Sequence, residues 1–118
     1  VRVVVLELAS KGNVVLIGRA GQRILVGFPG ALHVRLIAPL DLRVQRIATE
    51  QNIPLEAARS QIEASDAHRR QYLKRFYRVD WEDPSLYDLV INTGRMTSAA
   101  ACDLICMAAR HIDPVVGD

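Results

Sequence analysis

Short apolar runs alternate along this chain with segments whose apolar residues recur at helical spacing. Three such runs, Asn13–Gly18, Leu32–Ala38 and Leu89–Asn92, predict short strands, and continuous apolar runs of this kind are typical of strands buried on both faces. From Leu40 to Asn52 the apolar residues follow a helical period, and Pro39 suits the first turn of that helix. The alternation predicts an α/β fold with three parallel strands joined by right-handed crossovers.

The longest predicted helix covers about Leu55–Tyr77, and its middle is polar from Ser65 to Gln71. A long helix with such a centre is expected to project from the body or to border a cleft, with this stretch facing solvent. Residues Val1–Ala9 are expected to form the tail of a helix, with a strand as the alternative, and Gln22–Val26 a short helix. A last helix is expected to be capped by Thr97 or Ser98 and to end near Arg110.

The composition fits a single domain over residues 1–118. The chain has a mass of 13.1 kDa, half of its residues are hydrophobic and 24% are charged. No apolar run is long enough for a membrane span and no signal peptide is evident, so a cytoplasmic protein is expected.

Cys102 and Cys106 match neither a zinc pattern nor a disulfide framework, and both are interpreted as small buried residues. Because the first residue is Val1, the chain is treated as a piece of something longer.

The basic residues are almost all arginine. Lys11 and Lys74 are the only lysines among fifteen basic residues, and the net charge is +2. That charge is too small to indicate a nucleic-acid binder. Arginine is the planar donor suited to phosphate and carboxylate, although the codon usage of a GC-rich genome would also explain the bias.

Arg19 follows directly after the first predicted strand, in the run Gly18–Gly21. Open parallel sheets bind ligands at the carboxyl ends of their strands, so Arg19 is well placed to meet an anion. A surface arginine that caps a loop is an equally good interpretation.

A second cluster lies in the long helix. At 100° per residue, Asp66, Arg69 and Arg70 share one face, while Arg75 points the other way. Arginines on one face can converge on phosphoryl oxygens. The alternative is a solvated face with an Asp66–Arg70 pair four residues apart.

Arg43 and Arg46 lie three residues apart in the helix that follows the second strand, where they could contact a base or a phosphate. A solvated helix face is the alternative. The histidines show no metal-ligand spacing, so no metal site is predicted. The sequence also contains no G-x-x-x-x-G-K-[ST] motif, which would cradle a triphosphate.

In order, these pieces resemble the cytidylate-kinase-like family of P-loop nucleoside monophosphate kinases. The matching stretches are GNVVLIGRAG (Gly12–Gly21), HVRLIAPLDLRVQRI (His33–Ile47), EAARSQIEASDAHRRQYLKRFYRVDW (Glu56–Trp81) and LYDLVINTGRMTSAAACDLI (Leu86–Ile105). The resemblance implies a partial P-loop-kinase-like three-layer fold, the C-terminal half of the domain, with about three short parallel strands and four to five helices. Residues 13–19 would form the acceptor-site strand and the helix at about 55–77 would resemble a lid.

By this resemblance, the complete protein would transfer a phosphoryl group from ATP, with Mg²⁺, to a nucleoside monophosphate-like acceptor. The implied roles are catalytic for Arg69, Arg70 and Arg75, substrate-binding for Arg19 and Asp66, and ATP-side for Arg43 and Arg46. Cytidylate kinases place an Asp directly after the GR arginine, where this chain has Ala20, so the acceptor is left open. The portion with the P-loop is not in the sequence, so ATP and Mg²⁺ are not expected to be held by this piece, which is expected to be inactive alone.

Two rival functions remain open at this point. A kinase-like module without its P-loop would serve ligand sensing or oligomerisation in a larger protein. A basic RNA-contacting domain is the weaker alternative, because the chain has few aromatic residues and a nearly balanced charge. If a P-loop strand normally lies between the first two predicted strands, its absence leaves open edges. Either the two strands then pair directly or a homo-oligomer covers the edges, and the oligomer is expected. The expected ligand is a nucleotide or another phosphate-bearing small molecule, without membrane partners.

Overall fold

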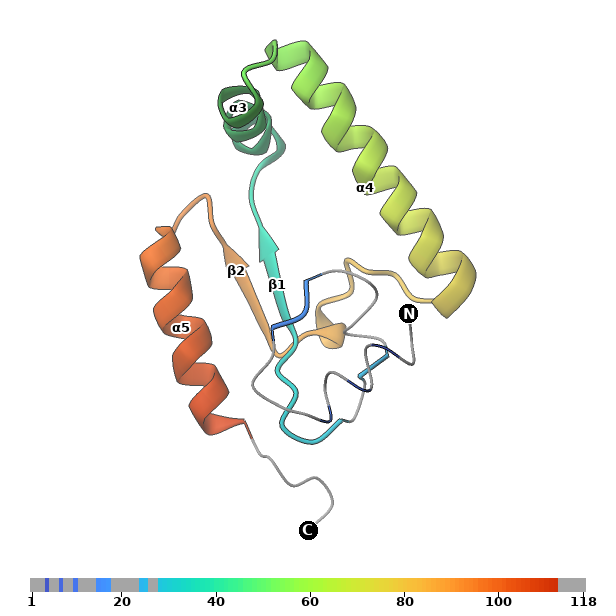
Figure 1. Cartoon of the computed structure of the whole chain (residues 1–118), viewed down its shortest axis with the longest axis vertical. Helices are drawn as coiled ribbons and strands as arrows, with labels where there is room; N and C mark the ends of the chain where they lie inside the picture. Colours follow the sequence, from blue (N-terminus) through green and yellow to red (C-terminus); the bar gives the residue numbers. More distant parts are fainter. Residues whose placement is uncertain are drawn as a thin grey trace.

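The computed structural model (Figure 1) contains two strands and three α-helices in the part of the chain that it describes. The described residues are 4, 7, 10, 15–17, 24, 25 and 28–112. The elements follow in the order β1 (Val34–Ile37), α3 (Leu40–Gln51), α4 (Leu55–Tyr77), a 3₁₀ turn (Pro84–Leu86), β2 (Leu89–Asn92) and α5 (Ser98–His111). In this view, the two strands lie between α5 on one side and α4 on the other. No helix among these residues is long and apolar enough to cross a membrane.

The strands β1 and β2 pair in parallel, with Val34 opposite Leu89 and Ile37 opposite Asn92. The Asp88 carboxylate accepts a hydrogen bond of 2.8 Å from the His33 amide just before the ladder begins. A parallel pair needs a crossover connection, and here α3 and α4 provide it. The α/β class and the parallel pairing of these two predicted strands are therefore confirmed.

The helices α3 and α4 form a hairpin at the carboxyl end of β1 (Figure 1). Asn52 ends α3 in the left-handed conformation, with φ 53°, and its amide donates to the Ala48 carbonyl. The short link then turns the chain back, and Pro54 precedes the first turn of α4. The two helices bury one small apolar core, formed by Val44, Ala48, Ala58 and Ile62.

The far end of α4 belongs to a second core. Leu73 is buried there with Ile24 and Leu25. Arg78 ends the helix at φ 56°, and its amide donates back to the Leu73 and Lys74 carbonyls. The polar middle of α4 faces solvent as predicted, since Asp66 is half-buried and its neighbours from His68 to Gln71 are exposed.

The first predicted strand is not found where the structure can test it. Residues 15–17 form no strand, and Val15 and Ile17 are 86% and 88% exposed. A strand is stable only beside a partner, and β1 pairs only with β2 among the described residues. Burial of the second predicted strand on both faces is also wrong, because Leu36 of β1 is 57% exposed. The described part therefore has a two-stranded sheet instead of about three strands, and α3, α4 and α5 are the α-helices whose bounds it gives.

Two predictions for the N-terminal region are supported at single positions. Val4, Glu7 and Ser10 are helical, in line with a helix that ends near this point. Ile24 is helical and is followed by a turn at Leu25, where the short second helix is expected. The remaining residues of both segments lie outside the described part of the chain.

The last helix, α5, begins as predicted, because the Thr97 hydroxyl accepts a hydrogen bond from the Ala100 amide. Its only buried residue is Ala101. Cys102 and Cys106 are both exposed, so their assignment as buried residues is wrong. No other described element packs against the side of α5 on which they lie. Because a small apolar side chain is buried only where another element packs against it, both cysteines remain exposed.

Candidate functional site

A groove of about 370 Å³ lies between α3 and α4. It is near the point where β1 leads into α3, at the carboxyl end of the parallel sheet, where open α/β sheets bind their ligands. Three arginines and two carboxylates line it, so cations outnumber anions. The lining residues are Arg43, Arg46, Ile47, Glu50, Gln61, Ile62, Ser65, Asp66 and Arg69.

Arg43 and Asp66 join the two walls of the groove. The guanidinium of Arg43 donates two hydrogen bonds, of 2.9 and 3.0 Å, to the two carboxylate oxygens of Asp66. This fork arrangement is the strongest geometry for such a pair. The hydrogen bonds from Arg43 lower the pKa of Asp66, and the same contact raises the pKa of Arg43. At neutral pH the pair is therefore fully charged and holds α3 against α4.

Arg46 connects α3 to the end of β2. It donates to the hydroxyl of Thr93 at 3.1 Å and to the carbonyl of the same residue at 2.8 Å. The Thr93 hydroxyl in turn donates to the Ile37 carbonyl at 3.0 Å. Arg46 thus closes a network over the carboxyl ends of both strands, and its charge lies in the groove without a carboxylate partner among the described residues.

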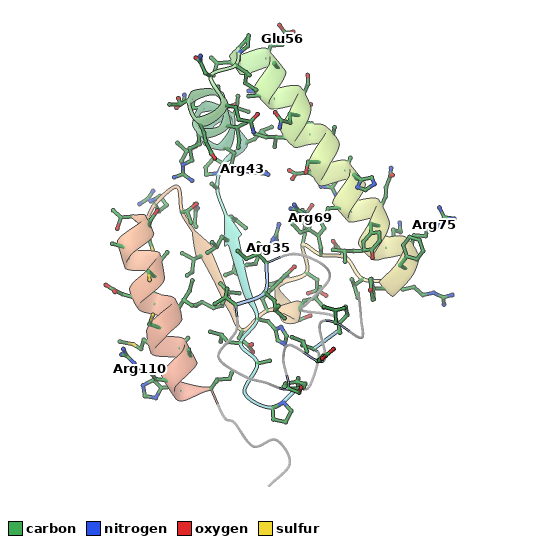
Figure 2. The ribbon with its side chains drawn as sticks, viewed as in Figure 1. Arg35, Arg43, Glu56, Arg69, Arg75 and Arg110 are labelled. Atoms are coloured by element: carbon green, nitrogen blue, oxygen red, sulfur yellow. The ribbon has the colours of Figure 1, made fainter. Side chains whose placement is uncertain are left out.

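Arg69 comes from α4, one turn beyond Asp66. Its guanidinium lies 5.1 Å from the centre of the Trp81 ring, a cation–π contact. Its charge also helps to lower the pKa of Asp66, after the larger effect of Arg43. Figure 2 shows Arg43, Arg69 and Arg35 on the side of β1 that faces α4, while Arg75 and Arg110 lie at the outside of the molecule.

The other two arginines predicted as site residues on α4 do not line the groove. Arg70 donates to the Glu82 carboxylate at 2.8 Å, and both side chains are about half exposed. Arg75 lies over the ring of Phe76 at 5.5 Å, near the far end of α4. The alternative pair between Asp66 and Arg70 is wrong, because each of the two has a partner outside the helix at better geometry. A solvated face is wrong for Arg43, which is hydrogen-bonded across the groove to Asp66. Arg46 is exposed on α3, as that alternative expects, and its guanidinium donates to Thr93 at the end of β2.

The structure therefore brings together Arg43, Arg46, Asp66 and Arg69, and it leaves Arg70 and Arg75 apart from them. Arg19 lies outside the described residues. Sequence reasoning overlooked Arg35, Trp81 and Thr93. Trp81 lies 46 positions from Arg35, and Thr93 lies 47 positions from Arg46 and 56 from Ile37. No local pattern indicates contacts at such separations, although the run W-E-D-P marks a turn next to the only tryptophan.

The chemistry of these side chains suits an anion. Arginines from two helices offer several N–H groups toward one groove, and a phosphate with three acceptor oxygens matches them. No group of three or more His, Cys, Asp or Glu side chains lies close enough to hold a metal ion among the described residues. The donor set in the described part of the chain therefore does not fit Mg²⁺.

Comparison of the sequence with known proteins shows the family to which this chain is related. The model of the cytidylate kinase-like family matches residues 1–95. A cytidylate kinase of Pyrococcus horikoshii is 32% identical over 110 residues, which cover 93% of this chain and 56% of that protein. A uronate isomerase of Corynebacterium glutamicum is 37% identical over 101 residues, which cover 86% of this chain and 19% of that protein.

The fold has a counterpart among solved structures. An uncharacterised protein of Eubacterium ventriosum matches with a TM-score of 0.86 at 21% sequence identity, over 92% of this chain and 62% of that one. The chain spans little more than half the length of the archaeal kinase. The family match covers four fifths of the chain and includes every residue that lines the groove. This chain belongs to the cytidylate kinase-like family.

Proposed function

We propose that this chain carries the acceptor-phosphate site of a kinase-like phosphotransferase, and that its groove binds a nucleoside monophosphate through the phosphate. The carrying observation is that Arg43, Arg46 and Arg69 converge from two helices on one groove at the carboxyl end of a parallel sheet. Family membership supports a kinase, and the arginine-rich lining supports a phosphorylated ligand.

Each arginine has a distinct task in this proposal. Arg43, held by Asp66, sets the width of the groove and presents a fixed positive charge. Arg46 places a second charge over the strand ends. Arg69 donates no hydrogen bond to any described residue, so its N–H groups remain for phosphoryl oxygens. In the complete protein, ATP would supply the phosphoryl group, and these residues would orient the acceptor and neutralise charge. For Arg43 and Arg46 this proposal replaces the ATP-side role implied by the resemblance, because both line the same groove as Arg69.

Isothermal titration calorimetry of this chain with cytidine, uridine and adenosine monophosphates and with inorganic phosphate tests the proposal. Arg69→Ala is expected to weaken binding of a monophosphate by about tenfold or more, since a charge-assisted hydrogen bond contributes about 1.5–3 kcal/mol. Arg110→Ala is the matched control, because Arg110 lies on α5 away from the groove (Figure 2). Equal affinities of the two variants would remove Arg69 from the site.

Arg19 enters the same experiment. As the arginine of the Gly18–Arg19 pair, it is proposed to contact the acceptor nucleotide. Arg19→Ala is then expected to weaken monophosphate binding more than Arg110→Ala does. A variant that binds like the parent chain would exclude Arg19 from the site.

A second function is favoured by the isomerase match. A segment similar to this chain occupies 19% of a protein that is named for another activity, as expected of a module attached to other domains. In that case the groove would bind a phosphorylated ligand without catalysis. An assay of the full-length gene product with radiolabelled ATP and a monophosphate separates the two functions, because only the kinase forms labelled diphosphate.

A further inference from the structure

Arg69 differs from the other arginines around the groove in how its position is maintained. Arg43 and Arg46 are each held by hydrogen bonds to another side chain or to the backbone, and so is Arg70 outside the groove. Arg69 has no such bond among the described residues, and its guanidinium lies over the Trp81 ring at 5.1 Å. A contact through the face of a guanidinium leaves the N–H groups at its edge unused. Trp81 can therefore hold Arg69 without consuming the donors that an anion needs.

Trp81 is itself held from the sheet. Arg35, in the middle of β1, places its guanidinium 4.7 Å from the same indole ring and 6.0 Å from the ring of Tyr87. The Tyr87 hydroxyl donates to the Trp81 carbonyl at 2.6 Å. Figure 2 shows Arg35 pointing from β1 toward Arg69. The indole thus connects a cation fixed on a strand to a cation on the exposed middle of α4.

This arrangement has an energetic cost that a purely structural cluster would avoid. The Nε atom of Arg35 and the indole Nε1 of Trp81 are both buried, and neither has a hydrogen-bond partner among the described residues. A buried donor without an acceptor costs about 1–3 kcal/mol. Two like charges beside one ring also repel each other. A cluster that served stability alone would not be expected to carry these costs, whereas one that positions Arg69 at the groove would.

We propose that Trp81 and Arg35 are positioning residues for Arg69: the indole holds the Arg69 guanidinium at the end of the groove, and Arg35 anchors the indole to β1. The inference rests on the proposed function, because the positioned group is the phosphate-binding arginine. Trp81 and Arg35 themselves act through Arg69 and need not touch the ligand.

A double-mutant cycle tests the coupling. In the parent chain, Trp81→Leu is expected to weaken cytidine monophosphate binding about three- to tenfold, which corresponds to the free energy of one cation–π contact. When Arg69→Ala is already present, Trp81→Leu should have no further effect. Trp81→Phe keeps an aromatic face and should retain most of the affinity. Arg35→Lys keeps the charge but loses the planar stacking, so it should behave like Trp81→Leu.

The Arg75–Phe76 pair provides the matched control, because it is a second cation–π contact on the same helix but outside the groove. Phe76→Leu should leave the affinity unchanged. If the losses from Trp81→Leu and Arg69→Ala multiply in the double variant, the two residues act independently and the positioning role is refuted.

A measurement without ligand guards against loss of folding in the variants. In ¹⁵N NMR spectra of the parent chain, the indole ring current should displace the Arg69 Nε–H signal, and Trp81→Leu should return it to the ordinary position while the Arg75 signal stays unchanged. An Arg69 signal at the ordinary position in the folded parent chain would overturn the contact. A displaced signal without any monophosphate binding by the parent chain would instead overturn the proposed function, and with it this role.

Discussion

At the scale of single residues, charge in this protein is organised by contacts between elements. Asp66 illustrates this, because it selects Arg43 on the facing helix and not Arg70 one turn away on its own helix. Its side chain is 19% exposed and that of Arg43 is 35% exposed, so water screens the pair less than it would screen a surface pair. The pair therefore contributes to the stability of the hairpin as well as to the groove.

Asp66→Asn is expected to destabilise the chain by about 1 kcal/mol at neutral pH. This is less than the roughly 1.5–3 kcal/mol typical of hydrogen bonds to charged groups, because water partly screens the pair. Because the folded-state pKa of Asp66 lies below its ordinary value of 3.8, the contribution is present above that pH and is lost as the pH falls through the lowered value. Urea unfolding at several pH values measures this effect. Glu63→Gln is the control on the same helix. At the lowest pH, Asp66→Asn and Glu63→Gln should have similar free energies of unfolding. If Asp66→Asn were still the less stable variant there, the assignment would be contradicted.

Cys102 and Cys106 offer a second test at this scale. The charge of Cys106 is the largest cause of the raised pKa of Cys102, followed by the hydrogen bond between the two thiols. Cys106→Ala removes both effects, so Cys102 should react with iodoacetamide at lower pH than in the parent chain. Cys106→Ser keeps a hydrogen-bonding group without the charge and should give an intermediate profile. Identical pH profiles for all three chains would show that the thiols do not interact.

At the scale of elements, the site depends on how α3 is placed over the ends of the strands. Gly94 lies in the turn after β2, and its amide donates to the Asn92 side chain at 2.9 Å. A Cβ atom at this position would lie 2.7 Å from the Cδ atom of Pro39 at the start of α3. The close approach brings Thr93 within reach of Arg46 and so couples β2 to the groove.

Gly94→Ala is therefore expected to destabilise the chain by about 1–3 kcal/mol, because a rigid proline ring and backbone must move apart. The displacement should also weaken monophosphate binding through the loss of the Arg46–Thr93 hydrogen bonds. Thermal unfolding and calorimetry measure the two effects. Ala100→Gly in α5 is a control for general loss of stability, since it lies away from Pro39, and it should leave the affinity of the folded chain unchanged.

At the scale of the whole molecule, the described residues form two small cores joined by one long helix. The hairpin core of α3 and α4 contains four buried residues, and Leu73 near the far end of α4 lies in the second core. Leu36 on β1 and Met107 on α5 are 57% and 59% exposed. Apolar surface of this kind, together with the edge of a two-stranded sheet, favours association.

A homo-oligomer that covers the surface around β1 stays a prediction of the sequence. Sedimentation equilibrium at micromolar protein is expected to show a dimer or a larger species. Leu36→Glu should shift the equilibrium toward monomer, whereas Leu55→Glu, at the equally exposed first residue of α4, should not. A parent chain that sediments as a monomer would contradict the prediction.

The sequence alone determined the elements whose signals are local. The periodic apolar residues and flanking prolines predicted α3 and α4 almost to the residue, and the short apolar run before Thr93 predicted β2. The arginine candidates were also visible, because residue type and helical spacing are properties of the chain itself. These features depend on neighbours within a few positions, so no knowledge of the fold is needed.

Only the tertiary structure decided which partners the charges find and which surfaces are covered. Asp66 meets Arg43 from 23 positions away, and Trp81 meets Arg35 from β1, because the crossover brings α4 and the following turn back beside the sheet. The same holds for burial: residues 15–17 look like a strand, yet Val15 and Ile17 are exposed. An apolar run indicates that its residues are suited to burial. Burial itself requires another element to pack against them, and the whole fold determines whether one does.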